Sequence, residues 1–291
     1  MTSTESSTST SVSTSTNTST SRPQIIFFGN GPLADAAKAT LATTCDIIFH
    51  ARTKSDLDEV KRLKTSQPTA HGVLASYGVI IKSDVLDLFE PEGILNIHPS
   101  SLPKYRGPSP IETAIVNGNT DFGVSIMKLV AAMDAGPLYY QTALNFSDNA
   151  PKSEIYTALA EAGATWLASK LASLAPTATL NQLVQPEPQQ GEPSYTKMLS
   201  TTLSKLDPAA HTATELERQI RAHIGWPKSK YTFYGKECII LAAHVLDSPA
   251  DAASATLAIK CKDNTYLAID TLQPAGKRPM DAKSFKNGYA K

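Results

Sequence analysis

The chain has 291 residues, 41% of them apolar and 19% charged, and a formal net charge of zero. This composition is typical of a soluble globular protein, and the zero net charge excludes an overall field that attracts nucleic acid. The length suits two ordinary domains, and no apolar run approaches the length needed to span a bilayer.

Charge is distributed unevenly along the chain. Residues 23–203 contain 13 basic and 17 acidic side chains, whereas residues 204–291 contain 13 basic and 9 acidic ones. A basic C-terminal part suits a polyanionic partner, but it suits scattered solvated charges equally well.

Residues 1–22 are almost entirely serine and threonine, with Glu5 and Arg22 as the only charges. Such a segment cannot bury enough apolar surface to offset the entropy lost on ordering, so we expect a disordered tail. The tail lacks the apolar h-region of a secretory signal. A Ser-rich plastid transit peptide is the alternative, although basic residues are nearly absent.

Between residues 24 and 98, short apolar runs alternate with helix-compatible segments. The predicted elements, strand and helix in turn, cover residues 24–28, 33–43, 46–49, 57–64, 71–78, 83–89 and 94–98, where residues 71–78 comprise the third strand and its terminal loop. This alternation predicts an α/β fold with a Rossmann-like, doubly wound, mostly parallel sheet. Ligands of such sheets bind beyond the carboxyl ends of the strands, and His98 stands at such an end.

The next elements complete the predicted N-terminal domain, which spans residues 23–175. We expect, in order, a helix, two strands and a long helix over residues 113–117, 123–130, 138–146 and 153–174. Residues 176–203 are predicted to be a linker, because four prolines and several Gln and Glu residues fall within residues 176–193.

The last part of the chain, residues 204–291, has a different pattern. A helix is predicted over residues 214–223, followed by short strands over residues 230–234, 237–245, 256–261 and 265–272. Several short strands separated by turn signals predict a small, OB-like β-barrel as the C-terminal domain.

The three cysteines, Cys45, Cys238 and Cys261, are far apart and show no CxxC spacing. They are typical of reduced, structural cysteines in a reducing compartment, and we expect a cytoplasmic protein.

The most informative residues are Asn96 and His98, two positions apart in a predicted strand. Residues i and i+2 of a strand point to the same face, so an amide and an imidazole lie side by side. Asp134 is available to orient or charge-balance the imidazole. An amide, an imidazole and a carboxylate are sufficient for acyl transfer to an amine without a covalent nucleophile.

Each of these residues also has an ordinary structural interpretation. A lone Asn is usually a turn or capping residue, a lone His is usually buried and hydrogen-bonded, and a loop Asp usually belongs to a turn. The pairing of Asn96 with His98 favours the functional interpretation.

Neither a dinucleotide nor a metal ion is predicted. Residues Gly29-Asn30-Gly31 lack the third glycine of the dinucleotide-binding pattern, and no suitable acidic residue ends the second strand. No His, Cys and Asp residues have metal-ligand spacing.

Residues 96–107, Asn-Ile-His-Pro-Ser-Ser-Leu-Pro-Lys-Tyr-Arg-Gly, together with Asp134, resemble the folate-dependent formyltransferase superfamily. Three further stretches resemble one branch of it, the methionyl-tRNA formyltransferases. These are residues 106–111, residues 217–227 with their Gly225-Trp226-Pro227, and residues 272–280. The resemblance covers roughly residues 24–291 in order, which a shared fold alone rarely produces.

The resemblance implies an enzyme that transfers the formyl group of 10-formyltetrahydrofolate to the amino group of initiator methionyl-tRNA. Asn96 would donate a hydrogen bond to the carbonyl oxygen, which becomes negatively charged as the amine attacks. His98 would accept a proton from the amine and pass it to the folate nitrogen, a role that suits histidine because its unperturbed side chain has a pKa of about 6.5. Asp134 would hold the imidazole and stabilise its charged form.

The resemblance also assigns binding residues. The implied folate-binding residues lie in three loops: Ser76, Tyr77, Gly78, Val79, Ile80, Ser100, Ser101, Leu102, Pro103, Ala131 and Met133. The implied tRNA-binding residues are basic: Arg106, Arg218, Arg221, Lys277 and Arg278. We expect a monomer.

One departure from the family pattern keeps other functions open. The family's long basic loop after the second strand is absent, because Phe49 leads directly to residues 50–54. This departure motivates a formyltransferase acting on a small amine, such as an amino sugar nucleotide or glycinamide ribonucleotide, although the basic C-terminal part argues against it. A catalytically idle folate- or RNA-binding module is a third hypothesis.

Overall fold

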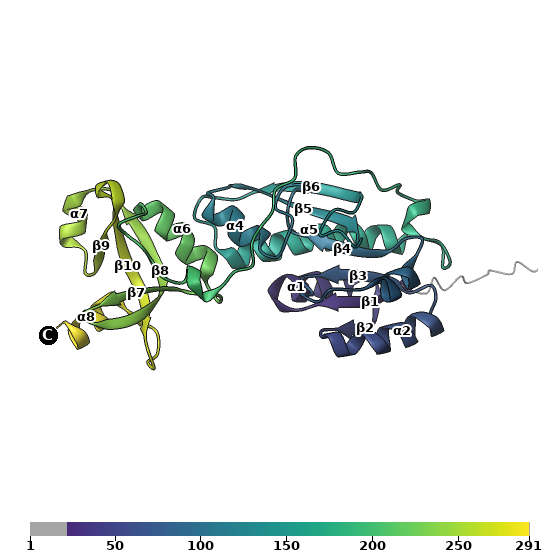
Figure 1. Cartoon of the computed structure of the whole chain (residues 1–291), viewed down its shortest axis with the longest axis horizontal. Helices are drawn as coiled ribbons and strands as arrows, with labels where there is room; N and C mark the ends of the chain where they lie inside the picture. Colours follow the sequence, from purple (N-terminus) through teal and green to yellow (C-terminus); the bar gives the residue numbers. More distant parts are fainter. Residues whose placement is uncertain (1–21, 291) are drawn as a thin grey trace, which may run out of the picture.

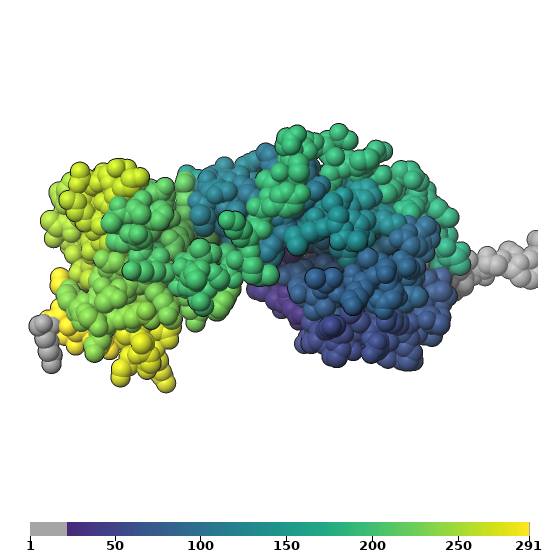
Figure 2. Space-filling model, viewed as in Figure 1, coloured from purple at the N-terminus to yellow at the C-terminus, as the bar shows by residue number. Residues whose placement is uncertain are grey.

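The computed structural model describes residues 22–290, which form two lobes side by side (Figures 1 and 2). The predicted tail over residues 1–22 lies outside the described residues except for Arg22, which forms an ion pair with Asp46. No helix of the described chain combines the length and the apolar character needed to cross a membrane.

The N-terminal lobe is built on a six-stranded sheet with strand order β2-β1-β3-β4-β5-β6. The strands are β1 (Gln24–Gly29), β2 (Asp46–Ala51), β3 (His71–Ala75), β4 (Ile94–His98), β5 (Asp121–Lys128) and β6 (Leu138–Asn145). β1 to β4 run parallel, while β5 is antiparallel to both of its neighbours. The prediction of a mostly parallel sheet is therefore confirmed, with β5 as the exception.

Helices cover both faces of this sheet, as expected for a doubly wound fold. One face packs on α1 (Gly31–Leu41), α4 (Pro110–Val116) and α5 (Lys152–Ala172). The opposite face packs on α2 (Leu57–Ser66) and α3 (Ser83–Leu86). Leu95 and Ile97 point to the first face, so Asn96 and His98 point to the second.

The C-terminal lobe is a curled antiparallel sheet with strand order β11-β10-β8-β7, in which β9 also pairs with β10. Its strands are β7 (Ser229–Phe233), β8 (Lys236–Leu246), β9 (Ala258–Lys260), β10 (Tyr266–Pro274) and β11 (Met280–Asp281). Helices α6 (Ala213–His223) and α8 (Ala282–Tyr289) pack on its apolar face, and α7 (Pro249–Ser254) precedes β9. The predicted barrel is thus a half-barrel closed by helices.

Several predicted boundaries shift for identifiable reasons. β3 ends at Ala75, within the segment 71–78 that was predicted to contain the third strand and its terminal loop, because Ser76 adopts a φ of +53°. α4 begins at Pro110, three residues earlier than predicted, because the fixed φ of proline suits the first helical turn. α7 and α8 were not predicted.

The predicted linker, residues 176–203, lies along the surface of the N-terminal lobe; we call it the strap (Figure 1). Leu138 and Glu187 exchange backbone hydrogen bonds of 2.7 and 2.8 Å, so the strap continues the edge of the sheet. Deeper in the lobe, Oε1 of Glu92 accepts a 2.5 Å hydrogen bond from the Leu180 amide of the strap. Oε2 of the same carboxylate lies 2.7 Å from Nδ1 of His71. The strap is therefore an integral part of the lobe's surface.

Two basic side chains fasten the lobes to each other where α6 faces the start of α5. The Lys152 amine donates to the carbonyl oxygens of Ala222 and Ile224 at the C-terminal end of α6, at 2.7 and 2.6 Å. A cation at this end also complements the helix dipole. In return, the Arg221 guanidinium donates to the Ala150 carbonyl at 3.1 Å.

His223, at the end of α6, lies in this interface and predicts a pH dependence of stability. It is only 4% exposed, and its Nδ1 has no hydrogen-bond partner among the described residues. Burial lowers the pKa of the imidazole, and the Lys152 cation lowers it further, while Glu112 opposes the shift. Below about pH 6.5, the ordinary pKa of histidine, His223 is protonated in the unfolded chain but stays neutral in the folded chain. The free energy of unfolding therefore falls as the pH is lowered.

We therefore expect His223→Gln to flatten this dependence. Urea unfolding at about pH 7.5 and about pH 5.5 should show a smaller loss of unfolding free energy in His223→Gln than in the unsubstituted protein. Equal losses in the two proteins would contradict this account of His223.

Candidate active site

Asn96 and His98 occupy the centre of the sheet in β4, and each is 5% exposed. β3 and β5 flank this strand, so both side chains are held on a rigid element. No hydrogen bond joins the Asn96 side-chain amide to any group of residues 22–290. Its donor is therefore available to a ligand that reaches this face of the sheet.

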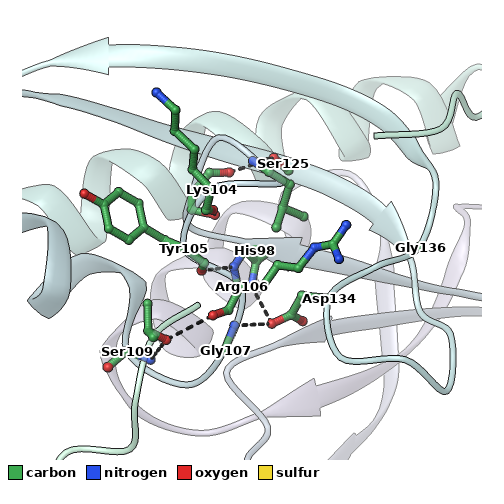
Figure 3. Close-up of polar contacts among 12 residues, drawn as sticks. His98, Lys104, Tyr105, Arg106, Gly107, Ser109, Ser125, Asp134 and Gly136 are labelled. Atoms are coloured by element: carbon green, nitrogen blue, oxygen red, sulfur yellow. Dashed lines mark hydrogen bonds and ion pairs between the residues drawn. The ribbon is translucent and has the colours of Figure 1, made fainter. Parts of the chain in front are cut away.

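The hydrogen bond made by His98 fixes which of its ring nitrogens carries the proton. Nε2 lies 3.1 Å from the carbonyl oxygen of Tyr105, and because a carbonyl can only accept, Nε2–H is the donor (Figure 3). Nδ1 faces the Asp134 carboxylate at 3.8 Å. In the neutral imidazole, Nδ1 is thus the basic nitrogen, and the carboxylate stabilises the ring once Nδ1 is protonated.

Asp134 reaches His98 because the β5–β6 loop folds back along β4. Lys128, the last residue of β5, pairs with Leu95 and therefore lies three residues from His98 along the neighbouring strand. Asp134 adopts a φ of +46°, which is rare for a residue with a side chain. Its carboxylate accepts a 2.7 Å hydrogen bond from the Gly107 amide.

Gly136 allows this loop to lie close to β5. A Cβ added to Gly136 would stand 1.8 Å from the carbonyl oxygen of Lys128, so no other residue fits without moving the loop. The position of Asp134 therefore depends on a close backbone contact two residues away.

The loop that follows β4 contacts both His98 and Asp134, through the Tyr105 carbonyl and the Gly107 amide respectively. The strap fixes this loop: the Ser194 hydroxyl accepts from the Tyr105 amide at 2.8 Å, and the Ser194 carbonyl accepts from the Arg106 amide at 2.9 Å. The Thr196 amide donates to the Arg106 carbonyl at 2.7 Å.

β5 and β6 hold the start of the same loop. The Ser125 hydroxyl donates to the Ser100 carbonyl at 2.6 Å and accepts from the Leu102 amide at 3.2 Å (Figure 3). Gln141 donates to the Leu102 carbonyl at 2.8 Å. Ser125, Gln141 and the strap residues could not be identified from the sequence, because their partners lie far away along the chain.

The residues predicted to bind folate fall into three segments. Ser76–Ile80 follow β3, and Ala131 and Met133 share the loop of Asp134. In these segments Ile80 is 87% and Met133 63% exposed, so both offer apolar surface on their loops. Among Ser100–Pro103, three residues are buried and engaged within the lobe: Ser100, Leu102 and Pro103. Contact of this segment with folate stays a prediction.

The predicted tRNA-binding residues are scattered. Lys277 and Arg278 are exposed in the turn after β10. The Arg218 guanidinium lies against Gly118, in the turn that follows α4. Arg221 is 9% exposed and forms an ion pair with Glu217 at 3.0 Å, which argues against a tRNA contact.

The Arg106 side chain is hydrogen-bonded within the N-terminal lobe. Its guanidinium donates to the Oε1 atom of the Gln189 side chain in the strap, at 2.7 and 3.2 Å. Among residues 22–290, no three His, Cys, Asp or Glu side chains are grouped so that they could hold a metal ion.

Comparison with known proteins identifies the chain's relatives. The family model of formyl transferases matches residues 13–171, and the model of the formyl transferase C-terminal domain matches residues 200–290. The chain is 35% identical over 269 residues to the methionyl-tRNA formyltransferase of Roseiflexus castenholzii, covering 89% of this chain and 83% of that one.

Solved structures share the fold at lower identity. The methionyl-tRNA formyltransferase from Clostridium thermocellum aligns with a TM-score of 0.63 and 15% identity, over 87% of this chain and 98% of that one. HypX from Aquifex aeolicus in complex with tetrahydrofolic acid aligns with a TM-score of 0.67 and 15% identity over 93% of this chain. The chain spans about half (48%) of the length of HypX.

The close contact at Gly136 leads to a test of the site geometry. Gly136→Ala must displace the loop of Asp134, and we expect it to lower the free energy of unfolding by about 1–3 kcal/mol, as overpacking does. The matched control is Gly288→Ala in α8, whose added Cβ meets nothing within 4 Å. If Gly136→Ala unfolds at the same denaturant concentration as the unsubstituted protein, the packing described for Gly136 is contradicted.

Proposed function

Because the chain belongs to the methionyl-tRNA formyltransferase family, we propose that it transfers the formyl group of 10-formyltetrahydrofolate to the amino group of methionyl-tRNA. The product, formylmethionyl-tRNA, serves translation initiation. The observation that carries the proposal is the meeting of Asn96, His98 and Asp134 on one face of the sheet, in a chain that both family models match.

Asn96 supplies the electrostatic part of the mechanism. Its side-chain amide has no hydrogen bond to a described residue, and a rigid central strand holds it in place. A donor held in this way can bind the formyl oxygen, on which negative charge develops when the amine attacks the formyl carbon.

His98 and Asp134 move the proton. The attacking amine forms a new C–N bond to the formyl carbon and gives up a proton, which the basic Nδ1 of His98 accepts directly or through water. Asp134, 3.8 Å away, stabilises the imidazolium. The proton then passes to the folate nitrogen as its bond to the formyl carbon breaks.

Folate fits the residues around this pair. The exposed apolar side chains of Ile80 and Met133 lie on the two loops that flank the catalytic residues, and they suit an aromatic ring system. The folate supplies the activated formyl group.

A cavity between the lobes supports a large acceptor. It has a volume of about 770 Å³, and its walls include Pro32 and Pro108 from the N-terminal lobe and Ile224, Trp226 and Ala242 from the C-terminal lobe. Pro108 follows the glycine whose amide holds Asp134. None of Asn96, His98 and Asp134 lines this cavity, so the cavity supports only an acceptor large enough to contact both lobes, as a tRNA would.

Cytoplasmic action is part of the proposal. It is supported by the three cysteines of the described chain, which are free and buried. A monomeric state stays a prediction.

The test is formyl transfer from labelled 10-formyltetrahydrofolate to methionyl-tRNA by the purified protein. We expect Asn96→Ala to lower kcat by about 10²–10³-fold through loss of the oxyanion donor. His98→Ala and Asp134→Asn should lower kcat by about 10²–10⁴-fold through loss of proton transfer.

These variants must fold to be informative, so circular dichroism and thermal unfolding accompany the assay. A folded, unsubstituted protein that formylates no aminoacyl-tRNA would refute the proposed acceptor. Full activity in His98→Ala would refute the proposed mechanism.

The exposed pair Lys277 and Arg278 allows a separate test of tRNA contact. If each side chain neutralises one phosphate, replacing both by Ala weakens tRNA binding and reduces the slope of log affinity against log salt by about one unit per contact. Lys236→Ala with Lys260→Ala removes the same charge from two other exposed positions of this lobe. An equal effect in both double variants would show that only net charge matters.

A further inference from the structure

Gln189, in the strap, uses every hydrogen-bonding position of its side-chain amide. Its Nε2 donates to the carbonyl oxygens of Asp134 and Gly136, each at 2.8 Å. Its Oε1 accepts from Nε and Nη2 of Arg106, at 3.2 and 2.7 Å. A Gln side chain has two donor hydrogens and two acceptor lone pairs, and here all four are satisfied within the protein.

One half of this amide holds the loop of Asp134. The left-handed backbone conformation at Asp134 costs about 1–2 kcal/mol, so the loop needs contacts that favour it over an extended alternative. The two donated hydrogen bonds span Asp134, Ala135 and Gly136 and fix the carbonyls on both sides of the bend.

The other half holds Arg106, between the two residues that contact the catalytic pair. The carbonyl of Tyr105 accepts from His98, and the amide of Gly107 donates to Asp134. Figure 3 shows the Arg106 side chain extending toward the loop that holds Asp134 and Gly136. Gln189 therefore joins the loop that orients His98 to the loop that supplies Asp134.

We propose that Gln189 is a positioning residue for formyl transfer, which keeps the Asp134 carboxylate facing Nδ1 of His98. It acts through Asp134 and does not contact the reacting atoms. The inference rests on the proposed function, because it presumes that His98 and Asp134 carry the reaction.

Two substitutions separate the two halves of the amide. Gln189→Met keeps the length of the side chain and removes all four hydrogen bonds. Gln189→Glu keeps the acceptors for Arg106 but replaces the donors with an oxygen that the carbonyls of Asp134 and Gly136 repel. If Gln189 acts by holding the loop of Asp134, both variants lower kcat by about 10- to 100-fold with little change in KM for folate.

The neighbouring Gln190 provides the matched control. It is exposed, and among residues 22–290 its amide donates only to the Pro188 carbonyl, at 3.3 Å. Gln190→Met and Gln190→Glu make the same chemical changes one residue along the strap, and they should leave kcat unchanged.

A double-substitution cycle then asks whether Gln189 acts through Asp134. In an Asp134→Asn background the carboxylate is already lost, so adding Gln189→Met should lower the residual kcat by about 2-fold or less. A residue that merely stabilises the fold would lower kcat by the same factor in both backgrounds.

Three results overturn the inference: unchanged kcat in Gln189→Met, near-normal kcat in Gln189→Glu, or full additivity with Asp134→Asn. A near-normal kcat in Gln189→Glu together with a raised KM for tRNA would show that Gln189 acts by holding Arg106 and not the loop of Asp134. Failure of the proposed function looks different, because the unsubstituted protein would then not formylate methionyl-tRNA, or His98→Ala would remain active.

Discussion

The site depends above all on the hydrogen bonds between the strap and the loop that follows β4. That loop contains the carbonyl of Tyr105, which contacts His98, and the amide of Gly107, which contacts Asp134. Neither group belongs to regular secondary structure, so the sheet alone cannot position it. The strap positions the loop through Ser194, which accepts hydrogen bonds from the backbone amides of Tyr105 and Arg106. As a result, Nε2 of His98 carries a proton and donates it to the Tyr105 carbonyl, while Nδ1 faces the Asp134 carboxylate.

The strap also links this arrangement to the C-terminal lobe, because it is the segment of chain that joins the two. α6 of that lobe is fastened to the N-terminal lobe by Lys152 and Arg221, whose charges meet backbone carbonyls across the interface. Hydrogen bonds from charged donors are each worth about 1.5–3 kcal/mol, so the lobes keep a defined relative orientation. An acceptor bound to both lobes would therefore meet the proposed catalytic residues, His98 and Asp134, already in place.

The sequence predicted the parts of this molecule that rest on local pattern. Alternating apolar runs and helices predicted the parallel strands, and i, i+2 spacing placed Asn96 and His98 on one face. The antiparallel direction of β5 could not be read from alternation, since a strand has the same periodicity in either direction. Asp134 was named from the sequence as a possible partner of the imidazole, but only the family resemblance favoured that role over an ordinary turn residue. Gln189 could not be distinguished from Gln185 or Gln190, because its partners lie more than 50 residues away and the prolines around it are typical of a linker.

The central claim is that this site carries formyl groups to an aminoacyl-tRNA. The most direct test is one reaction mixture that contains labelled 10-formyltetrahydrofolate, methionyl-tRNA and an amino sugar nucleotide, with the unsubstituted protein and the His98→Ala variant run in parallel. The account predicts that the label enters the tRNA fraction and that His98→Ala abolishes this transfer. Label in the sugar nucleotide with none in the tRNA would contradict it.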